Sequence, residues 1–190
     1  MDGLAGPGYV VWPGYAGADT AAALSGAFAA RQAAGLLRHA AVGAGSAKAV
    51  RLDVRGDAIS WIEVSDEGPA GEFLSGLNDL RLHGNRELML GLTTLEMHFA
   101  RFAPGRGYAR HHDVSPQGAD RVISLIYYLN RHWRAGDGGE LELETDDGPV
   151  LIEPRADTLV AFLSARFYHT VLPAVRERQS VTGWFHRGAG

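Results

Sequence analysis

The second half of the chain, from about residue 90 onward, is divided into short β-rich runs by glycine, proline and aspartate. Eight such runs follow one another, at 94–102, 108–114, 121–130, 139–145, 150–154, 158–164, 169–175 and 180–187. Short strands separated by turn residues are typical of closed antiparallel sheets. The pattern therefore predicts a double-stranded β-helix, or jelly roll, over residues 91–190.

The first 90 residues have a different pattern. A short apolar strand at 9–12 precedes an alanine-rich helix over 21–40, which Asp19 or Thr20 could cap. Residues 48–64 alternate apolar and polar side chains on both sides of Gly56 and Asp57, which favours a hairpin, and residues 69–91 have a helical pattern with one or two breaks at glycine. We expect a single α+β domain over 1–190, in which residues 1–90 supply helices packed on one face and a hairpin lid.

The composition excludes several kinds of site. The sequence has no cysteine, so any metal must be held by nitrogen and oxygen ligands. The formal net charge is -4 and no block of lysine or arginine occurs, so we expect no nucleic-acid partner. No signal peptide or long apolar run is present, so we expect no membrane association and a cytoplasmic location.

The segment "GYARHHDVSPQG" places two histidines and an aspartate in succession at 111–113. In a strand, side chains alternate between the two faces, so His111 and Asp113 share one face while His112 and Arg110 lie on the other. A His-x-Asp pair alone is weak evidence for a metal site.

A third potential ligand, His169, lies far along the chain in the strand-like run 169–175. Two histidines and one carboxylate form the facial triad that binds non-haem Fe(II) and leaves coordination positions open. The sequence therefore indicates His111, Asp113 and His169 as a metal site.

Arg178 follows His169 by nine residues, on the strand face that also carries Ser180, Thr182 and Trp184. Two neutral imidazoles and one carboxylate leave Fe(II) with a charge of about +1, and a 2-oxo diacid bound to it keeps a second carboxylate remote from the metal. The planar guanidinium of Arg178 can bind that carboxylate through two hydrogen bonds, and the hydroxyl of Tyr128 could add a third.

The sequence resembles a known family. The segments "PGRGYARHHD", "RVISLIYYLNRHW", "GGELEL", "IEP", "LVAFLS", "HTVLP" and "RQSVTGWF" occur in the order found in the prolyl-hydroxylase branch of the Fe(II)/2-oxoglutarate dioxygenases. This branch includes the animal oxygen-sensing enzymes and smaller bacterial relatives. The resemblance runs from residue 94 to 187, and "RGDAISWI" extends it toward the N-terminus.

The resemblance implies roles for individual residues. His111, Asp113 and His169 would bind iron, and Arg178 and Tyr128 would hold the C5 carboxylate of 2-oxoglutarate. The pocket of this cosubstrate would be lined by Ile126, Leu141, Val171 and Thr182, and the substrate would face Tyr108, Arg121 and Trp184. Phe102 departs from the pattern, because the family often has a tyrosine there, and a hydroxyl near the cosubstrate is therefore missing.

The implied reaction is a hydroxylation with Fe(II), 2-oxoglutarate and O2, which releases succinate and CO2, with ascorbate as a candidate reductant. The implied acceptor is C4 of a prolyl residue in a protein, for which elongation factor Tu is the candidate among bacterial relatives. The same chemistry on a free amino acid or small metabolite, a non-enzymatic jelly roll that binds metal or sugar, and a nucleic-acid demethylase are the alternatives. The sequence leaves the oligomeric state open, and a monomer is compatible with it.

Four other expectations concern single residues and the site's surroundings. His98 is expected to be a hydrogen-bonded residue of the core or near the site, and Trp61 and Trp133 to pack in the core or beneath a loop. Gly138 and Gly139 are expected to have positive φ angles. A protein substrate requires an open cleft, which we expect between the hairpin 48–64 and the loop after Asp113.

Overall fold

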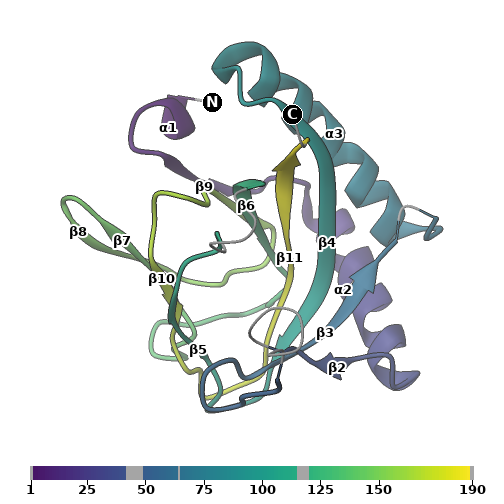
Figure 1. Cartoon of the computed structure of the whole chain (residues 1–190). Helices are drawn as coiled ribbons and strands as arrows, with labels where there is room; N and C mark the ends of the chain where they lie inside the picture. The colour runs from purple at the N-terminus through teal and green to yellow at the C-terminus, as the bar shows by residue number, and fades with distance from the viewer. Residues whose placement is uncertain (1, 42–48, 64, 115–119, 189–190) are drawn as a thin grey trace.

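The computed structural model describes residues 2–41, 49–63, 65–114 and 120–188, and its strands form two antiparallel sheets (Figure 1). The larger sheet has seven strands in the order β1 (Tyr9–Pro13), β9 (Thr158–Leu163), β6 (Arg121–Tyr128), β11 (Arg178–Arg187), β4 (Leu92–Phe102), β3 (Asp57–Ile62) and β2 (Arg38–His39). The smaller sheet has four strands in the order β5 (Tyr108–His111), β10 (His169–Val171), β7 (Leu141–Thr145) and β8 (Gly148–Ile152).

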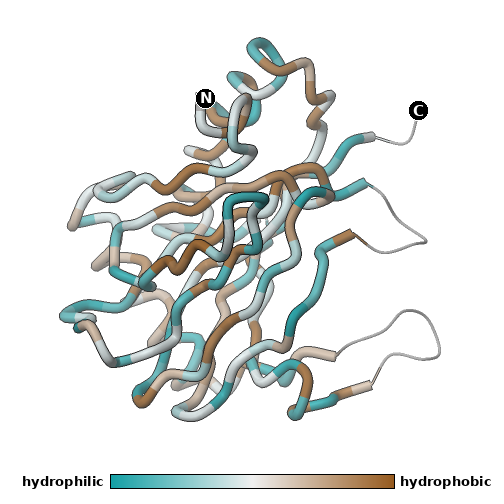
Figure 2. The backbone as a smooth tube through the Cα atoms, turned by 90° about the vertical axis from the view of Figure 1, so that its left-hand side faces the viewer, coloured by the Kyte–Doolittle hydropathy of each residue, from teal (hydrophilic) through white to brown (hydrophobic). Residues whose placement is uncertain are grey.

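The two sheets face each other across an apolar interior. Side chains of the larger sheet, such as Ile126, Tyr128 and Phe162, pack there with Leu141 and Leu143 of the smaller sheet. The backbone carries both hydrophobic and hydrophilic stretches along its strands (Figure 2). The predicted jelly roll is confirmed.

Helices cover the outer face of the larger sheet (Figure 1). The short helix α1 (Asp2–Ala5) precedes β1, and two longer helices follow, α2 (Ala18–Ala33) and α3 (Pro69–Leu88). Phe28 of α2 and Leu77 of α3 are buried in one cluster with Phe99 of β4 and Tyr127 of β6. Burial of a side chain of this size contributes about 1.5–3 kcal/mol, so this cluster fixes the sheet that carries the site. No helix in the described part of the chain has the length and apolar character of a membrane span.

Several predicted boundaries are wrong. Helix α2 ends at Ala33 rather than residue 40, because Gly35 adopts a left-handed φ of 65° and the Leu36 N–H returns to the Arg31 carbonyl at 2.9 Å. Neither Asp19 nor Thr20 caps its start. Helix α3 continues through its glycines to Leu88.

The predicted hairpin over 48–64 is not found among its described residues, 49–63. Residues 57–62 are the strand β3, but β3 pairs with β4 and β2 instead of with the segment before it. Trp61 on β3 is 43% exposed, so the expectation that it packs in the core or beneath a loop is wrong, whereas Trp133 is buried as predicted. Residues 48 and 64, at the ends of that prediction, lie outside the described residues.

The register of the larger sheet places functional side chains in rows. Thr182 of β11 lies opposite His98 of β4 and Ile126 of β6. Two positions away toward the C-terminus, Trp184 lies opposite Ser124, and at the start of β11 Arg178 lies opposite Phe102. Successive rows on one face are two residues apart, about 6.6 Å, so Arg178 and Trp184 stand at opposite ends of one surface that faces the smaller sheet.

Candidate active site

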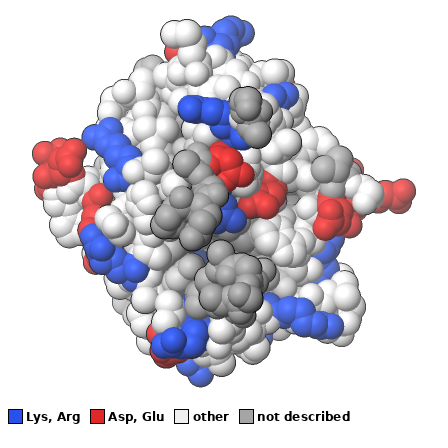
Figure 3. All heavy atoms as spheres, in the orientation of Figure 1, with Lys and Arg blue, Asp and Glu red and all other residues white. Residues whose placement is uncertain are grey.

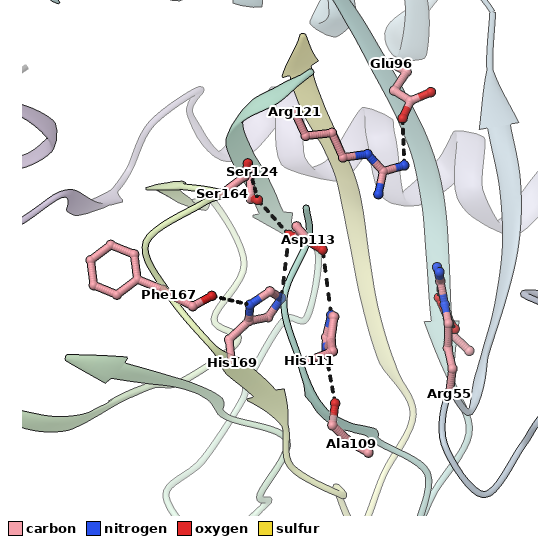
Figure 4. A network of polar contacts seen from close by, with 11 residues as sticks. Arg55, Glu96, Ala109, His111, Asp113, Arg121, Ser124, Ser164, Phe167 and His169 are labelled. Atoms are coloured by element: carbon pink, nitrogen blue, oxygen red, sulfur yellow. Dashed lines mark hydrogen bonds and ion pairs between the residues drawn. The ribbon is translucent and has the colours of Figure 1, made fainter. Parts of the chain in front are cut away.

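Three potential metal ligands meet where the two sheets face each other (Figure 4). His111 ends β5, and His169 lies directly opposite it at the start of β10. Asp113 comes two residues after β5, so the expectation that it lies within the strand is wrong, although its side chain joins His111 as predicted. Asp113 Oδ1 is 3.7 Å from His111 Nε2, and Asp113 Oδ2 is 3.6 Å from His169 Nε2.

Both imidazoles are oriented by backbone carbonyls. His111 Nδ1 is 2.8 Å from the Ala109 carbonyl oxygen, and His169 Nδ1 is 3.5 Å from that of Phe167. A proton on Nδ1 leaves the Nε2 lone pair free to face the centre of the triad. Burial and, to a smaller extent, the neighbouring His169 ring lower the pKa of His111 to about 4. The imidazole is therefore neutral, as a metal ligand must be.

The carboxyl of Asp113 is nine-tenths buried, and burial raises its pKa. His169 and His111 and a hydrogen bond from Ser124 outweigh that effect, so the pKa of Asp113 stays below its usual value. The three side chains thus present two neutral nitrogens and one carboxylate to the same point.

The three ligands line a cavity, and Arg178 is buried in the wall of this cavity with 2% of its surface exposed. Its Nε donates to the Gly139 carbonyl at 2.8 Å, and one terminal nitrogen is 3.4 Å from the Tyr128 hydroxyl. Among the described carboxylates none forms an ion pair with it, and the nearby Asp57 is paired with Arg55 at 2.7 Å. A buried cation without an acidic partner is costly, so this position is suited to an anionic ligand.

The loop before β7 supports that arginine. Gly138 and Gly139 have φ angles of 73° and 72°, as predicted. A Cβ atom on Gly139 would lie 2.9 Å from Ala174 and 3.3 Å from Arg178 Cδ. Glycine therefore allows the Gly139 carbonyl to approach and hold the guanidinium.

The remaining predicted site residues divide into two groups. Six of them line the cavity, namely Tyr108, Arg121, Ile126, Val171, Thr182 and Trp184. Tyr128 and Leu141 are fully buried and lie behind the cavity wall within the apolar interior. Of these two, Tyr128 still reaches the site through its contact with Arg178.

The side chains expected to face the substrate are held by stacking. The ring of Tyr108 lies 3.5 Å from that of His111 at an interplanar angle of 14°. The guanidinium of Arg55 lies 5.1 Å from the centre of the Tyr108 ring. The guanidinium of Arg121 lies 3.6 Å from the centre of the Trp184 ring and pairs with Glu96 at 2.9 Å. Charges of both signs are interspersed on the face seen in Figure 3.

The comparisons with known proteins agree with this geometry. Residues 97–186 match the 2OG-Fe(II) oxygenase superfamily. The crystal structure of a Pseudomonas putida prolyl-4-hydroxylase superposes with a TM-score of 0.90 at 39% identity, covering 98% of this chain and 96% of that one. The chain belongs to the prolyl-hydroxylase branch of the Fe(II)/2-oxoglutarate oxygenases.

Two animal relatives extend the comparison. Human Egl nine homolog 1 is 36% identical over 142 residues, which are 70% of this chain and 33% of the human protein. The chain therefore spans about a third of that relative's length. A prolyl hydroxylase from Trichoplax adhaerens has a TM-score of 0.87 at 28% identity, covering 97% of this chain and 86% of that one.

The cofactor and cosubstrates of this family are Fe(II), 2-oxoglutarate and O2. The donor set of two imidazoles and one carboxylate is the one that non-haem Fe(II) prefers. Arg178 offers the planar, charged donors that a dicarboxylate needs at its far end. The residues present thus fit both the metal and the cosubstrate.

Four residues of the site were not predicted from the sequence. Arg55 and Asp57 line the cavity as an ion pair, with Asp57 2% exposed, because β3 joins the sheet beside β4. Ser124 lies two residues before Ile126 on the same face of β6, so the two-residue period of the strand could have indicated it. Ser164 lies at the end of the predicted run 158–164, on the same face as Phe162, so the same period could have indicated it.

His98 lies in the cavity wall with 1% of its surface exposed, between Trp61 at 4.8 Å and Trp184 at 5.6 Å. Its Nδ1 has no hydrogen-bond partner among the described residues, so the expected hydrogen bond is not found there. Burial lowers the pKa of His98 to about 3, assisted by the charges of Arg55 and Arg121 and opposed by Asp113.

This shift makes stability depend on pH. The unfolded state takes up a proton on His98 below its ordinary pKa of 6.5 while the folded state does not, so stability present above pH 6.5 is lost as the pH falls toward 3. We expect the group to remove about 2 kcal/mol of unfolding free energy between pH 7 and pH 5. Urea unfolding at both pH values should show a smaller loss in His98→Phe than in wild type. Equal losses would mean that His98 is protonated within the fold.

Proposed function

We propose that the protein is an Fe(II)- and 2-oxoglutarate-dependent dioxygenase that hydroxylates C4 of a prolyl residue in a protein. The observation that carries this proposal is the convergence on one cavity of the His111–Asp113–His169 triad and Arg178, which forms no ion pair with a described carboxylate. We further propose that the chain acts as one domain over 1–190, because β1, β2 and β3 from the first 90 residues complete the sheet of the jelly-roll catalytic core.

Each residue then has a role. His111, Asp113 and His169 hold the metal, and Arg178 with the Tyr128 hydroxyl binds the remote carboxylate of 2-oxoglutarate. Bound Fe(II) supplies the oxygen chemistry, in which 2-oxoglutarate becomes succinate and CO2 while the prolyl carbon is hydroxylated. Ile126, Val171 and Thr182 exclude water from the cosubstrate, with Leu141 packed behind them.

The relatives favour a protein acceptor. The Trichoplax adhaerens prolyl hydroxylase was solved with a peptide fragment of the hypoxia inducible factor oxygen degradation domain. One ring face of Tyr108 is covered by His111 and one of Trp184 by Arg121, so the ring edges that line the cavity can pack against a proline ring, and Arg121 can donate to a peptide carbonyl. Elongation factor Tu is our candidate acceptor. The loop expected on one side of the cleft falls largely on residues 115–119, which lie outside the described residues.

Mass spectrometry of proteins from cells with and without this enzyme tests the proposal. We expect a gain of one oxygen atom on a specific proline only when the active enzyme is present. Purified enzyme should form succinate from 2-oxoglutarate and Fe(II), faster with the identified peptide. Succinate formation without any modified protein would favour a free amino acid or small metabolite, and no succinate at all would favour a binding module. The cytoplasmic location, the lack of a nucleic-acid partner and the use of ascorbate stay predictions.

The mouth of the cavity should affect the acceptor more than the cosubstrate. Because Arg121 lies on Trp184 rather than beside Arg178, we expect Arg121→Ala to lower kcat/KM for the prolyl peptide about tenfold or more, the worth of a charged hydrogen bond. Slow 2-oxoglutarate turnover without peptide should change less than about threefold. Arg176→Ala, which removes an exposed arginine stacked on Trp133, is the matched control. An equal fall of both activities would place Arg121 in the cosubstrate pocket.

A further inference from the structure

The ligand carboxylate of Asp113 is not held by the strand that precedes it. Strand β5 ends at His111, so Asp113 has no place in its hydrogen-bonded ladder. A carboxylate on a connecting segment can rotate about its side-chain torsions, and a metal ligand loses affinity when its orientation is not fixed. The position of Asp113 therefore requires support from elsewhere in the fold.

Two serines, one on a strand of the larger sheet and one directly after another of its strands, supply a chain of contacts to that carboxylate (Figure 4). Ser124 Oγ on β6 is 2.6 Å from Asp113 Oδ2, and Ser164 Oγ, directly after β9, is 2.9 Å from Ser124 Oγ. Ser124 is 2% exposed and Ser164 is fully buried. The backbone fixes Ser164 as well, because its N–H donates to the Val122 carbonyl at 3.0 Å.

The direction of these hydrogen bonds follows from counting protons. An ionised carboxylate only accepts, and each serine hydroxyl has one proton to donate. Ser124 must therefore give its proton to Asp113, so that the contact between the two hydroxyls requires Ser164 to donate to Ser124. A hydroxyl that accepts one hydrogen bond is a stronger donor in the next, and its rotation is fixed.

We propose that Ser164 and Ser124 form a two-hydroxyl relay that fixes the Asp113 carboxylate for metal binding. Ser124 is the positioning residue in contact with the ligand, and Ser164 acts only through Ser124. The relay rests on the metal site of the proposed function, and it makes β6 and β9 part of the support of that site.

Calorimetric titration with Mn(II) in the absence of 2-oxoglutarate tests the relay without relying on turnover. We expect Ser124→Ala to weaken Mn(II) binding by about 10- to 100-fold, as removal of such supporting hydrogen bonds does at other metal sites. Ser164→Ala should weaken it less, about three- to tenfold, because Ser124 can still donate. Ser124→Thr keeps the hydroxyl and should bind Mn(II) within about threefold of wild type.

The double variant gives the decisive comparison. Because Ser164 acts through Ser124, Ser124→Ala/Ser164→Ala should bind Mn(II) as Ser124→Ala does, whereas independent roles would make the two losses add. Ser60→Ala is the matched control, since Ser60 is a buried serine that accepts a hydrogen bond from Arg31 at 3.0 Å and is not part of the cavity wall. Its Mn(II) affinity should equal that of wild type.

The outcomes separate the relay from the metal site itself. The relay alone would be overturned if Ser124→Ala bound Mn(II) as tightly as wild type, or if the losses of the two single variants added in the double variant. Failure of wild type to bind Mn(II), or full binding by His111→Ala, would overturn the proposed metal site. Thermal unfolding without metal identifies alanine variants that lose the fold. In that case the Mn(II) affinities of Ser124→Thr and Ser164→Thr, which keep the hydroxyl groups, are compared with that of wild type.

Discussion

His111→Ala and Asp113→Ala are each expected to abolish 2-oxoglutarate turnover. The triad provides three protein ligands whose ligand atoms lie within 4.8 Å of one another, and no other described histidine or carboxylate belongs to this cluster. Loss of one ligand should also weaken Mn(II) binding by about 100-fold or more, because the outer support of such a site alone is worth 10- to 100-fold. Succinate formation and calorimetry measure the two effects.

His112→Ala is the control for this pair. The His112 ring lies 5.0 Å from Tyr168, and although it borders the cavity it is not among the three clustered ligands. We expect this variant to keep most of its turnover and its Mn(II) affinity. A folded but inactive His112→Ala beside an active His111→Ala would reverse the assignment of the two histidines.

The sequence was sufficient to identify the chemistry of the site because the residues that carry it lie in strands or beside them. The two-residue period placed Arg178, Thr182 and Trp184 on one face, which the cavity confirms. The same period paired His111 with Asp113 correctly, although Asp113 lies beyond the end of its strand. That pairing survives because the chain turns Asp113 toward His169.

Contacts between distant segments could not be predicted in this way. The N–H groups of Ala16 and Gly17, just before α2, donate to Asp157 at 2.9 and 3.0 Å, across about 140 residues of chain. Similarly, β3 pairs with the distant strands β4 and β2 rather than with residues 49–55 directly before it, and so extends the sheet whose outer face is covered by helices. Local alternation predicts a strand but does not identify its partner.

Arg178→Lys should raise the apparent KM for 2-oxoglutarate by about 10- to 100-fold, the worth of a charge-assisted contact. The guanidinium uses Nε to bind the Gly139 carbonyl and still has terminal nitrogens for Tyr128 and for a carboxylate in the cavity. A lysine has one compact ammonium group, which cannot keep these contacts and also bind a carboxylate through two parallel hydrogen bonds. Initial rates of succinate formation at varied 2-oxoglutarate concentration measure the effect.

Arg176→Lys provides the matched comparison, because Arg176 lies two residues before Arg178, at the spacing that puts side chains on the same nominal strand face. Arg176 is exposed, lies over Trp133 at 5.0 Å and contacts Asp137 at 3.4 Å, and it is not part of the described cavity wall. The KM of this variant for 2-oxoglutarate should therefore stay within about twofold of wild type, as expected for an exposed charge.

Since Arg178 is fully enclosed, its substitution also tests the charge requirement itself: Arg178→Met should lose the cosubstrate altogether while Mn(II) binding at the triad persists. If Arg176→Lys raised the KM and Arg178→Lys did not, the carboxylate would bind at Arg176, and the buried guanidinium of Arg178 would serve only to hold Gly139 and Tyr128 in place.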